Sequence, residues 1–172
     1  IVSLGRFAPD KRQLAQIDIA RKLPGIDFHI MGFAGNQAYY RQCEERVRNT
    51  GARNVHLHPS APHEEVVAKL KSSKYFLHTL IQEPFGITAV QAMAAGCIPI
   101  VHDSGGQRET VPVPELRYSD LDELPDVIGA LEKRPDADLQ DLQQRLVRHV
   151  EQFGEAPFRA AMREALAPVL QA

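Results

Sequence analysis

The chain has 172 residues, 44% of them hydrophobic, and a formal net charge of −2. This length fits one globular domain with a proper core, and the hydrophobic content argues against intrinsic disorder. The near-neutral charge gives no reason to expect a nucleic-acid or membrane surface, and Cys43 and Cys97 are too few for a disulfide framework. We interpret both as buried thiols of a reducing compartment.

The chain opens with Ile1-Val2-Ser3-Leu4 and shows no signal peptide. Because this opening resembles a buried strand, we expect the chain to be about half of a two-domain protein whose N-terminal, acceptor-binding domain is absent from it. The most apolar stretch, residues 86–101, is interrupted by a glutamine, a glycine and a proline, so it does not predict a membrane-spanning segment.

Short β-like runs alternate with longer amphipathic segments along the chain. The pattern predicts strands at 1–4, 28–31, 55–58, 75–79, 98–101 and 116–118. It predicts helices at 10–23, 37–50, 63–72, 86–95, 121–133, 138–153 and 156–170. This alternation predicts one α/β domain over residues 1–172, a Rossmann-like, doubly wound parallel sheet of about six strands with helices on both faces. The extra C-terminal helices are expected to pack across a face or an edge, or to reach toward the missing domain.

The commonest order for six such strands is 3-2-1-4-5-6, which puts the switch point between the first and fourth strands. Ligands bind there, outside the carboxyl ends of the strands. The loops expected to meet at that crevice are 5–11 and 80–86.

The second of these loops carries Glu83-Pro84-Phe85-Gly86 just before an apolar helical segment. Gly86 permits a tight turn, and the free N–H groups of the helix that follows favour an anion. Glu83 is placed to accept hydrogen bonds from hydroxyl groups beside that anion. A ligand that carries a phosphate next to a sugar suits this arrangement.

The first loop carries Arg6 directly after the first strand and Lys11 near the start of the next helix. Two cations that converge on one crevice suit a diphosphate, since Arg gives a forked contact and Lys a point charge. Taken alone, the spacing is also typical of a solvated basic loop. Opposite Glu83 and Gly86 we favour the diphosphate site.

Fold and loops together resemble the C-terminal, donor-binding half of a GT-B glycosyltransferase of the retaining group 1 type (family 4). The residues that carry this resemblance are Gly5, Arg6 and Lys11; Glu83, Pro84, Phe85 and Gly86; Ala92 to Gly96; Pro99; and Gly105, Gly106 and Glu109. The resemblance covers about residues 1 to 133.

The resemblance implies a role for each matching position. Arg6 and Lys11 would hold the nucleotide diphosphate, and with Glu83 they form the expected catalytic set. Glu83 and the backbone from Phe85 to Thr88 would hold the transferred sugar and its phosphate. The full set of expected donor-binding residues is Gly5, Phe85, Gly86, Ile87, Thr88, Gln91, Ser60 and Ala61, of which Ser60 and Ala61 would lie near the nucleobase.

Gln91 departs from the family pattern, which has Glu at this position for the ribose hydroxyls. Glutamine still accepts one hydrogen bond and donates others, but it brings no charge. Donor binding is expected to survive with weaker ribose contact. A shifted donor preference and a lost activity are the alternatives.

The resemblance implies sugar transfer from a nucleotide diphosphate sugar, GDP- or UDP-linked, to an acceptor hydroxyl with retention. It implies no cofactor and no metal, a glycan or lipid-linked glycan as acceptor, and a cytoplasmic location, at the cytoplasmic face of a membrane through parts outside this chain. Residues 77–79 and 102–106 are similar to eukaryotic mannosyltransferases that extend lipid-linked oligosaccharides from GDP-mannose, which favours mannose over glucose. This chain alone is expected to bind donor without turnover.

Two alternatives stay open: a sugar-nucleotide epimerase or phosphorylase half, and a non-catalytic nucleotide-sugar-binding module marked by Gln91. His56 and His58 share a strand face, but their surroundings in the sequence do not favour a metal. His78 and His102 end the fourth and fifth strands, where they either line the crevice or are hydrogen-bonded core histidines.

Overall fold

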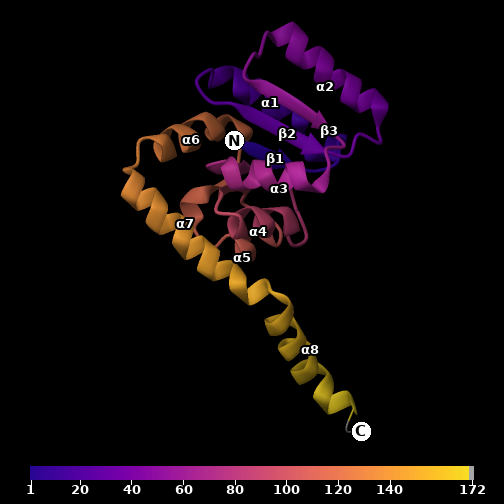
Figure 1. Cartoon of the computed structure of the whole chain (residues 1–172), viewed down its shortest axis with the longest axis vertical. Coiled ribbons are helices and arrows are strands. Elements are labelled where there is room, and N and C mark those ends of the chain that lie inside the picture. Colours follow the sequence, from indigo (N-terminus) through magenta and orange to yellow (C-terminus); the bar gives the residue numbers. More distant parts are fainter. Residues whose placement is uncertain (171–172) are drawn as a thin grey trace.

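A parallel six-stranded sheet forms the centre of the computed structural model, which describes residues 1–170 (Figure 1). The strands stand in the order β3-β2-β1-β4-β5-β6, as the sequence predicts. Their bounds are β1 Val2–Leu4, β2 Phe28–Gly32, β3 Val55–Pro59, β4 Tyr75–Leu77, β5 Ile98–His102 and β6 Arg117–Tyr118. Every observed pairing is parallel.

The central strands are continuous apolar runs because helices cover both faces of the sheet. Phe76 and Leu77 in β4 and Ile100 in β5 are completely buried. Phe76 pairs in register with both Val2 of β1 and Pro99 of β5, which locks the two halves of the sheet together at the switch point.

The helices that follow the strands form the outer layers. Their bounds are α1 Gln13–Lys22, α2 Gln37–Thr50, α3 His63–Ser72, α4 Ile87–Ala94, α5 Gln107–Thr110, α6 Leu124–Glu132, α7 Asp136–Val150 and α8 Glu155–Leu170. α1 packs against α2 and α6, whereas α4 packs against α7. Right-handed crossovers in both directions from β1 place α3 and α4 on the face opposite to α1 and α2.

Element boundaries differ from the sequence-based expectation where the backbone changes conformation. The first helix begins at Gln13 rather than Asp10, because Arg12 has a left-handed backbone (φ 58°) that separates a 3₁₀ turn, Pro9–Lys11, from α1. The helix expected at 121–133 likewise begins as a 3₁₀ turn, Leu121–Glu123, before α6. The short helix α5 was not predicted, since four residues are too few to show a period.

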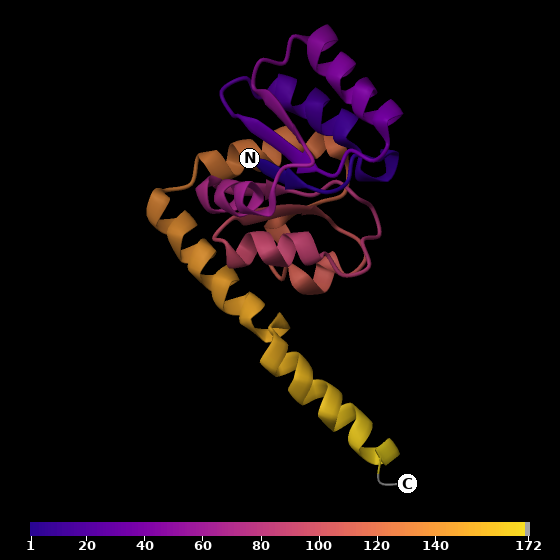
Figure 2. The same ribbon diagram turned by 45° about the vertical axis from the view of Figure 1, so that its right-hand side comes forward.

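The two C-terminal helices behave differently. α7 packs on the domain through four buried apolar side chains, Leu139, Leu142, Leu146 and Val150. α8 extends away from the sheet in both views of the ribbon (Figures 1 and 2), and it exposes Phe158, Met162 and Leu166. Within the described residues, none of the helices combines the length and the apolarity needed to cross a bilayer.

Candidate functional site

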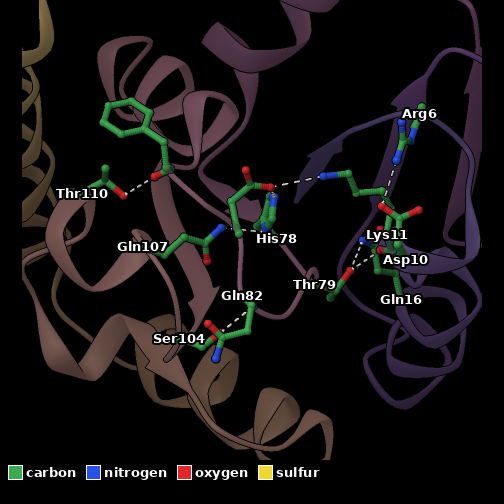
Figure 3. A network of polar contacts seen from close by, with 12 residues as sticks. Arg6, Asp10, Lys11, Gln16, His78, Thr79, Gln82, Ser104, Gln107 and Thr110 are labelled. Atoms are coloured by element: carbon green, nitrogen blue, oxygen red, sulfur yellow. Dashed lines mark hydrogen bonds and ion pairs between the residues drawn. The ribbon is translucent and has the colours of Figure 1, made fainter.

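The loops after β1 and β4 meet at the carboxyl edge of the sheet, as the strand order predicts. Lys11 Nζ lies 3.2 Å from Glu83 Oε2, and the two side chains are 21% and 18% exposed (Figure 3). Thr79 Oγ1 donates to the Lys11 carbonyl (2.6 Å) and accepts from Gln16 Nε2 (2.7 Å). These bonds fix the Lys11 backbone to the end of β4, so the ammonium and the carboxylate are held together.

Arg6 lies in the same loop but points to solvent. Its side chain is 67% exposed, and Nη2 lies 3.3 Å from Asp10 Oδ2, one helical turn along the chain. Its backbone is anchored, because Gln13 Nε2 donates to the Arg6 carbonyl (2.8 Å). Lys11 therefore contacts Glu83, whereas Arg6 is an exposed cation beside the site.

The turn before α4 has the geometry that the sequence suggests. Gly86 is the N-cap residue of α4 and has a left-handed backbone (φ 92°). Because glycine has no side chain to accept from the first-turn N–H groups of Ile87 and Thr88, these donors are available to a ligand. Phe85 and Ile87 are exposed on either side of the turn.

Two glycines after β5 hold the Glu83 loop in place. A Cβ atom on Gly105 would lie 2.4 Å from the Glu83 carbonyl oxygen, and one on Gly106 would lie 2.1 Å from the Pro84 carbonyl oxygen. The Gly106 N–H donates to the Glu83 carbonyl at 2.9 Å. Only residues without a side chain permit this backbone contact, so the pair acts as a packing surface for the Glu83 loop.

His78 lies directly beneath Glu83 and is 4% exposed. Its Nε2 is 3.4 Å from Glu83 Oε2, and its Nδ1 is 2.7 Å from Gln107 Nε2. Burial, with the neighbouring Lys11 ammonium as the next cause, lowers the pKa of His78 to about 4. Of the two alternatives for His78, both hold: it is a hydrogen-bonded core histidine, and it contacts the site.

A groove of roughly 370 Å³ runs between α3 and α4, next to the end of β1. Its lining includes Leu4, His63, Val66 and the exposed side chain of Gln91. Ser60 lies just before α3 and ties two loops together, since its N–H donates to the Gly32 carbonyl (2.7 Å) and its Oγ accepts from the Ala34 N–H (3.3 Å). Ala61 follows it and is half-buried.

Backbone strain concentrates at this same edge. Among the described residues, the non-glycine residues with positive φ are Arg12 (58°), Ser60 (53°) and Gln82 (57°). They lie in the loops after β1, β3 and β4. Left-handed backbone in such residues is costly and is enriched at functional sites, which is a further reason to regard this edge as the candidate site.

The histidines on β2, β3 and β5 have polar or ring partners. His102 contacts Ser104 Oγ (2.8 Å) and the Ser119 carbonyl (3.1 Å). On β2 and β3, His29 Nδ1 lies 3.0 Å from His58 Nε2, and His56 Nε2 lies 3.0 Å from Asp27 Oδ1. Over residues 1–170, no group of three or more His, Cys, Asp or Glu side chains is arranged to hold a metal ion.

Comparison with known proteins identifies the family. The model described as "Glycosyl transferases group 1" matches residues 1–113. The chain belongs to the group 1 glycosyltransferases.

Curated relatives narrow the comparison. The human GDP-Man:Man(3)GlcNAc(2)-PP-Dol alpha-1,2-mannosyltransferase is 30% identical over 127 residues, which is 66% of this chain and 26% of the relative. A Saccharomyces cerevisiae phosphatidylinositol N-acetylglucosaminyltransferase GPI3 subunit is 26% identical over 137 residues, or 77% of this chain and 30% of the relative. The chain thus spans about a quarter to a third of the length of these relatives.

Solved structures confirm the fold of this group 1 domain. A sucrose-phosphate synthase from Thermosynechococcus elongatus superposes with a TM-score of 0.85 over 99% of this chain and 45% of its own, at 22% identity. The pneumococcal O-GlcNAc transferase GtfA, solved with UDP and GlcNAc, gives 0.74 over 99% of this chain and 36% of its own, at 19% identity. At these identities the likeness establishes a GT-B, Rossmann-like fold.

Glu83, Lys11 and Gly86, which the sequence predicts as site residues, lie at one edge of the sheet. The side chains that contact Glu83 were not predicted from the sequence. Gln107 was not predicted to take part, although its place directly after Gly105-Gly106 is the one signal that puts it beside the Glu83 loop.

Proposed function

We propose that this chain is the donor-binding domain of a retaining glycosyltransferase that transfers mannose from a GDP-linked donor to an acceptor hydroxyl. The observation that carries the proposal is the meeting of Lys11, Glu83 and the N-terminal end of α4 at the switch point of the sheet. Membership of the group 1 family and the names of the mannosyltransferase relatives support the reaction and the sugar.

Each part of the donor has chemistry that suits it at this edge. Lys11, the exposed guanidinium of Arg6 and the first-turn N–H groups of α4 would stabilise the diphosphate, on which negative charge grows as the glycosidic bond breaks. Glu83 would accept hydrogen bonds from sugar hydroxyls. The groove beside Gln91 would take the nucleoside, with the ribose near the amide and the base toward Ser60 and Ala61.

Parts outside this chain complete the proposal. The acceptor, a glycan that is lipid-linked as in the names of the mannosyltransferase relatives, would bind a separate N-terminal domain. The protein would work in the cytoplasm, at a membrane face, and this chain alone would bind donor without turnover. The reaction would use neither cofactor nor metal, since protein cations neutralise the leaving group.

Calorimetry with GDP-mannose, UDP-glucose and the free diphosphates tests the proposal. We expect GDP-mannose to bind most tightly, and the double variant Arg6→Ala/Lys11→Ala to lose binding. Lys22→Ala/Arg41→Ala is the matched control, because it removes the same charge at the end of α1 and on the outer face of α2. Undiminished affinity in the Arg6/Lys11 variant would refute the diphosphate assignment.

Gln91 favours a second candidate, a binding module that has lost transfer. Substitution Gln91→Glu in the full-length protein separates the two. A large gain in transfer indicates that the glutamine had disabled the site, whereas unchanged transfer indicates a working glutamine.

A further inference from the structure

Three polar side chains, in contact one with the next, lead from the core to the candidate site. Gln107 is completely buried, the His78 side chain is 4% exposed and the Glu83 side chain is 18% exposed. In Figure 3 the Gln107 amide points toward the His78 ring. Gln107 Nε2 lies 2.7 Å from His78 Nδ1, and His78 Nε2 lies 3.4 Å from Glu83 Oε2. The second distance is that of an ion-pair contact and is longer than the 2.7–3.2 Å of a typical N–H···O hydrogen bond, and contacts of this kind often tighten only when a substrate binds.

The protonation state of His78 follows from the two side chains that it contacts, Glu83 and Gln107. An ionised carboxylate only accepts, so a hydrogen on His78 Nε2 is favourable and a lone pair there would repel Glu83. A neutral imidazole with hydrogen on Nε2 has a lone pair on Nδ1, which needs a donor, and the Gln107 amide nitrogen supplies it. Burial and the Lys11 ammonium disfavour a second proton on the ring. One tautomer alone satisfies both contacts.

We propose that His78, held as its Nε2–H tautomer by Gln107, is a positioning residue that orients the Glu83 carboxylate toward the sugar of the donor. This inference rests on the proposed function, because it assumes that Glu83 binds sugar hydroxyls. Both partners of the carboxylate, Lys11 and His78, contact Oε2. Within the described residues, Oε1 is the oxygen that they leave for a ligand.

The histidine matters most once donor is bound. Lys11 is assigned to the diphosphate, and an ammonium that turns toward phosphate weakens its hold on Glu83. His78 cannot follow it, because its ring is buried, Gln107 holds Nδ1, and the Tyr118 hydroxyl donates to its carbonyl at 3.0 Å. His78 would therefore keep the Glu83 carboxylate in place while Lys11 stabilises the diphosphate leaving group.

The first test reads the tautomer directly. In the wild-type chain with ¹⁵N-labelled histidine, we expect one buried imidazole with hydrogen on Nε2 and a bare Nδ1, unchanged between pH 6 and 8. The signal is assigned to His78 by correlating the ring with the sequentially assigned backbone of the wild-type chain, and its loss in a folded His78→Gln variant checks that assignment. A hydrogen on Nδ1, or a doubly protonated ring at pH 7, would overturn the inference whether or not any donor binds.

The second test compares two neutral amides at position 78. Gln places its amide nitrogen near the former Nε2 and keeps a donor for Glu83, whereas Asn reaches only the former Nδ1. For GDP-mannose we expect affinity within about threefold of wild type for His78→Gln and a loss of about tenfold for His78→Asn, the size of one hydrogen bond to a charged group. Affinity for GDP alone should stay within about twofold in both, because GDP carries no sugar for Glu83 to bind.

Each outcome decides something different. Equal losses for GDP and GDP-mannose would indicate a merely structural histidine and overturn the inference, as would a folded His78→Asn variant with wild-type affinity for GDP-mannose. If neither variant folds, the tautomer measurement decides alone. If the wild-type chain binds no sugar nucleotide, the proposed function fails, and the tautomer still tests the link from Gln107 to Glu83.

Discussion

A single methyl group at position 106 should separate the two loops that build the candidate site. In Gly106→Ala the new Cβ would start 2.1 Å from the Pro84 carbonyl oxygen, so the backbones must part by about 1 Å to reach ordinary contact. That movement breaks the 2.9 Å hydrogen bond from the Gly106 N–H to the Glu83 carbonyl, worth about 1 kcal/mol. Overpacking adds about 1–3 kcal/mol. We expect a loss of unfolding free energy of about 2–4 kcal/mol.

Substitutions at other glycines of this chain separate the two causes of lost stability, steric contact and backbone strain. Gly106 has an ordinary φ of −67°, so its substitution reports the steric contact alone. Gly51 has φ 63° and open space where a Cβ would lie, so Gly51→Ala reports the left-handed backbone alone, about 1–2 kcal/mol. Gly105 combines φ 60° with a 2.4 Å contact, so Gly105→Ala should cost about the sum of the other two. Gly129 lies in α6 with open space, and Gly129→Ala should stabilise by about 1 kcal/mol.

Urea unfolding of the four variants measures these differences, and calorimetry with GDP-mannose follows their effect on the site. Gly106→Ala should also weaken donor binding, because it displaces the Glu83 backbone, while Gly51→Ala and Gly129→Ala should leave binding unchanged. A Gly106→Ala variant as stable as wild type, or less affected than Gly51→Ala, would refute the reasoning that close backbone contact holds the Glu83 loop.

Three further predictions concern buried titratable groups. The pKa values of His29 and His78 are both lowered to about 4, chiefly by burial, so the unfolded chain binds more protons than the folded chain between pH 6.5 and 4. The unfolding free energy, measured by urea titration, should therefore fall as the pH drops through that window. A flat profile would contradict the neutral state of these two rings in the folded chain. Tyr118→Phe removes the hydroxyl that donates to the His78 carbonyl and should cost about 1–3 kcal/mol in the same assay, whereas no cost would show that this bond is dispensable. Burial raises the pKa of both Cys43 and Cys97 to about 11, so a thiol reagent at pH 8 should label neither in the native chain and both in urea; rapid labelling of the native chain would contradict their burial.

The sequence predicts the sheet better than the site. Short apolar runs and helical spacing are local signals, and the right-handed crossover rule turns them into one strand order. The roles of Glu83 and Gly86 are likewise predicted from a local signal, their position just before an apolar helical segment. What the sequence does not give is pairing across space: that Lys11 meets Glu83 while Arg6 turns to Asp10, or that Gln107 reaches His78 from 29 residues away. Such contacts depend on side-chain directions that no periodic pattern encodes.

The Lys11–Glu83 pair is better explained by function than by stability. A partly buried ion pair gives up hydration on both groups, and its attraction roughly repays that cost, so its net contribution to folding is small. Around this pair the fold also maintains two left-handed non-glycine residues, Arg12 and Gln82, each costing about 1–3 kcal/mol. A site tuned for stability alone would replace these with relaxed turns and apolar contacts. Under the proposed function, a charged, hydroxyl-rich ligand at the open helix end would supply the partners that these groups lack, and only when it is bound.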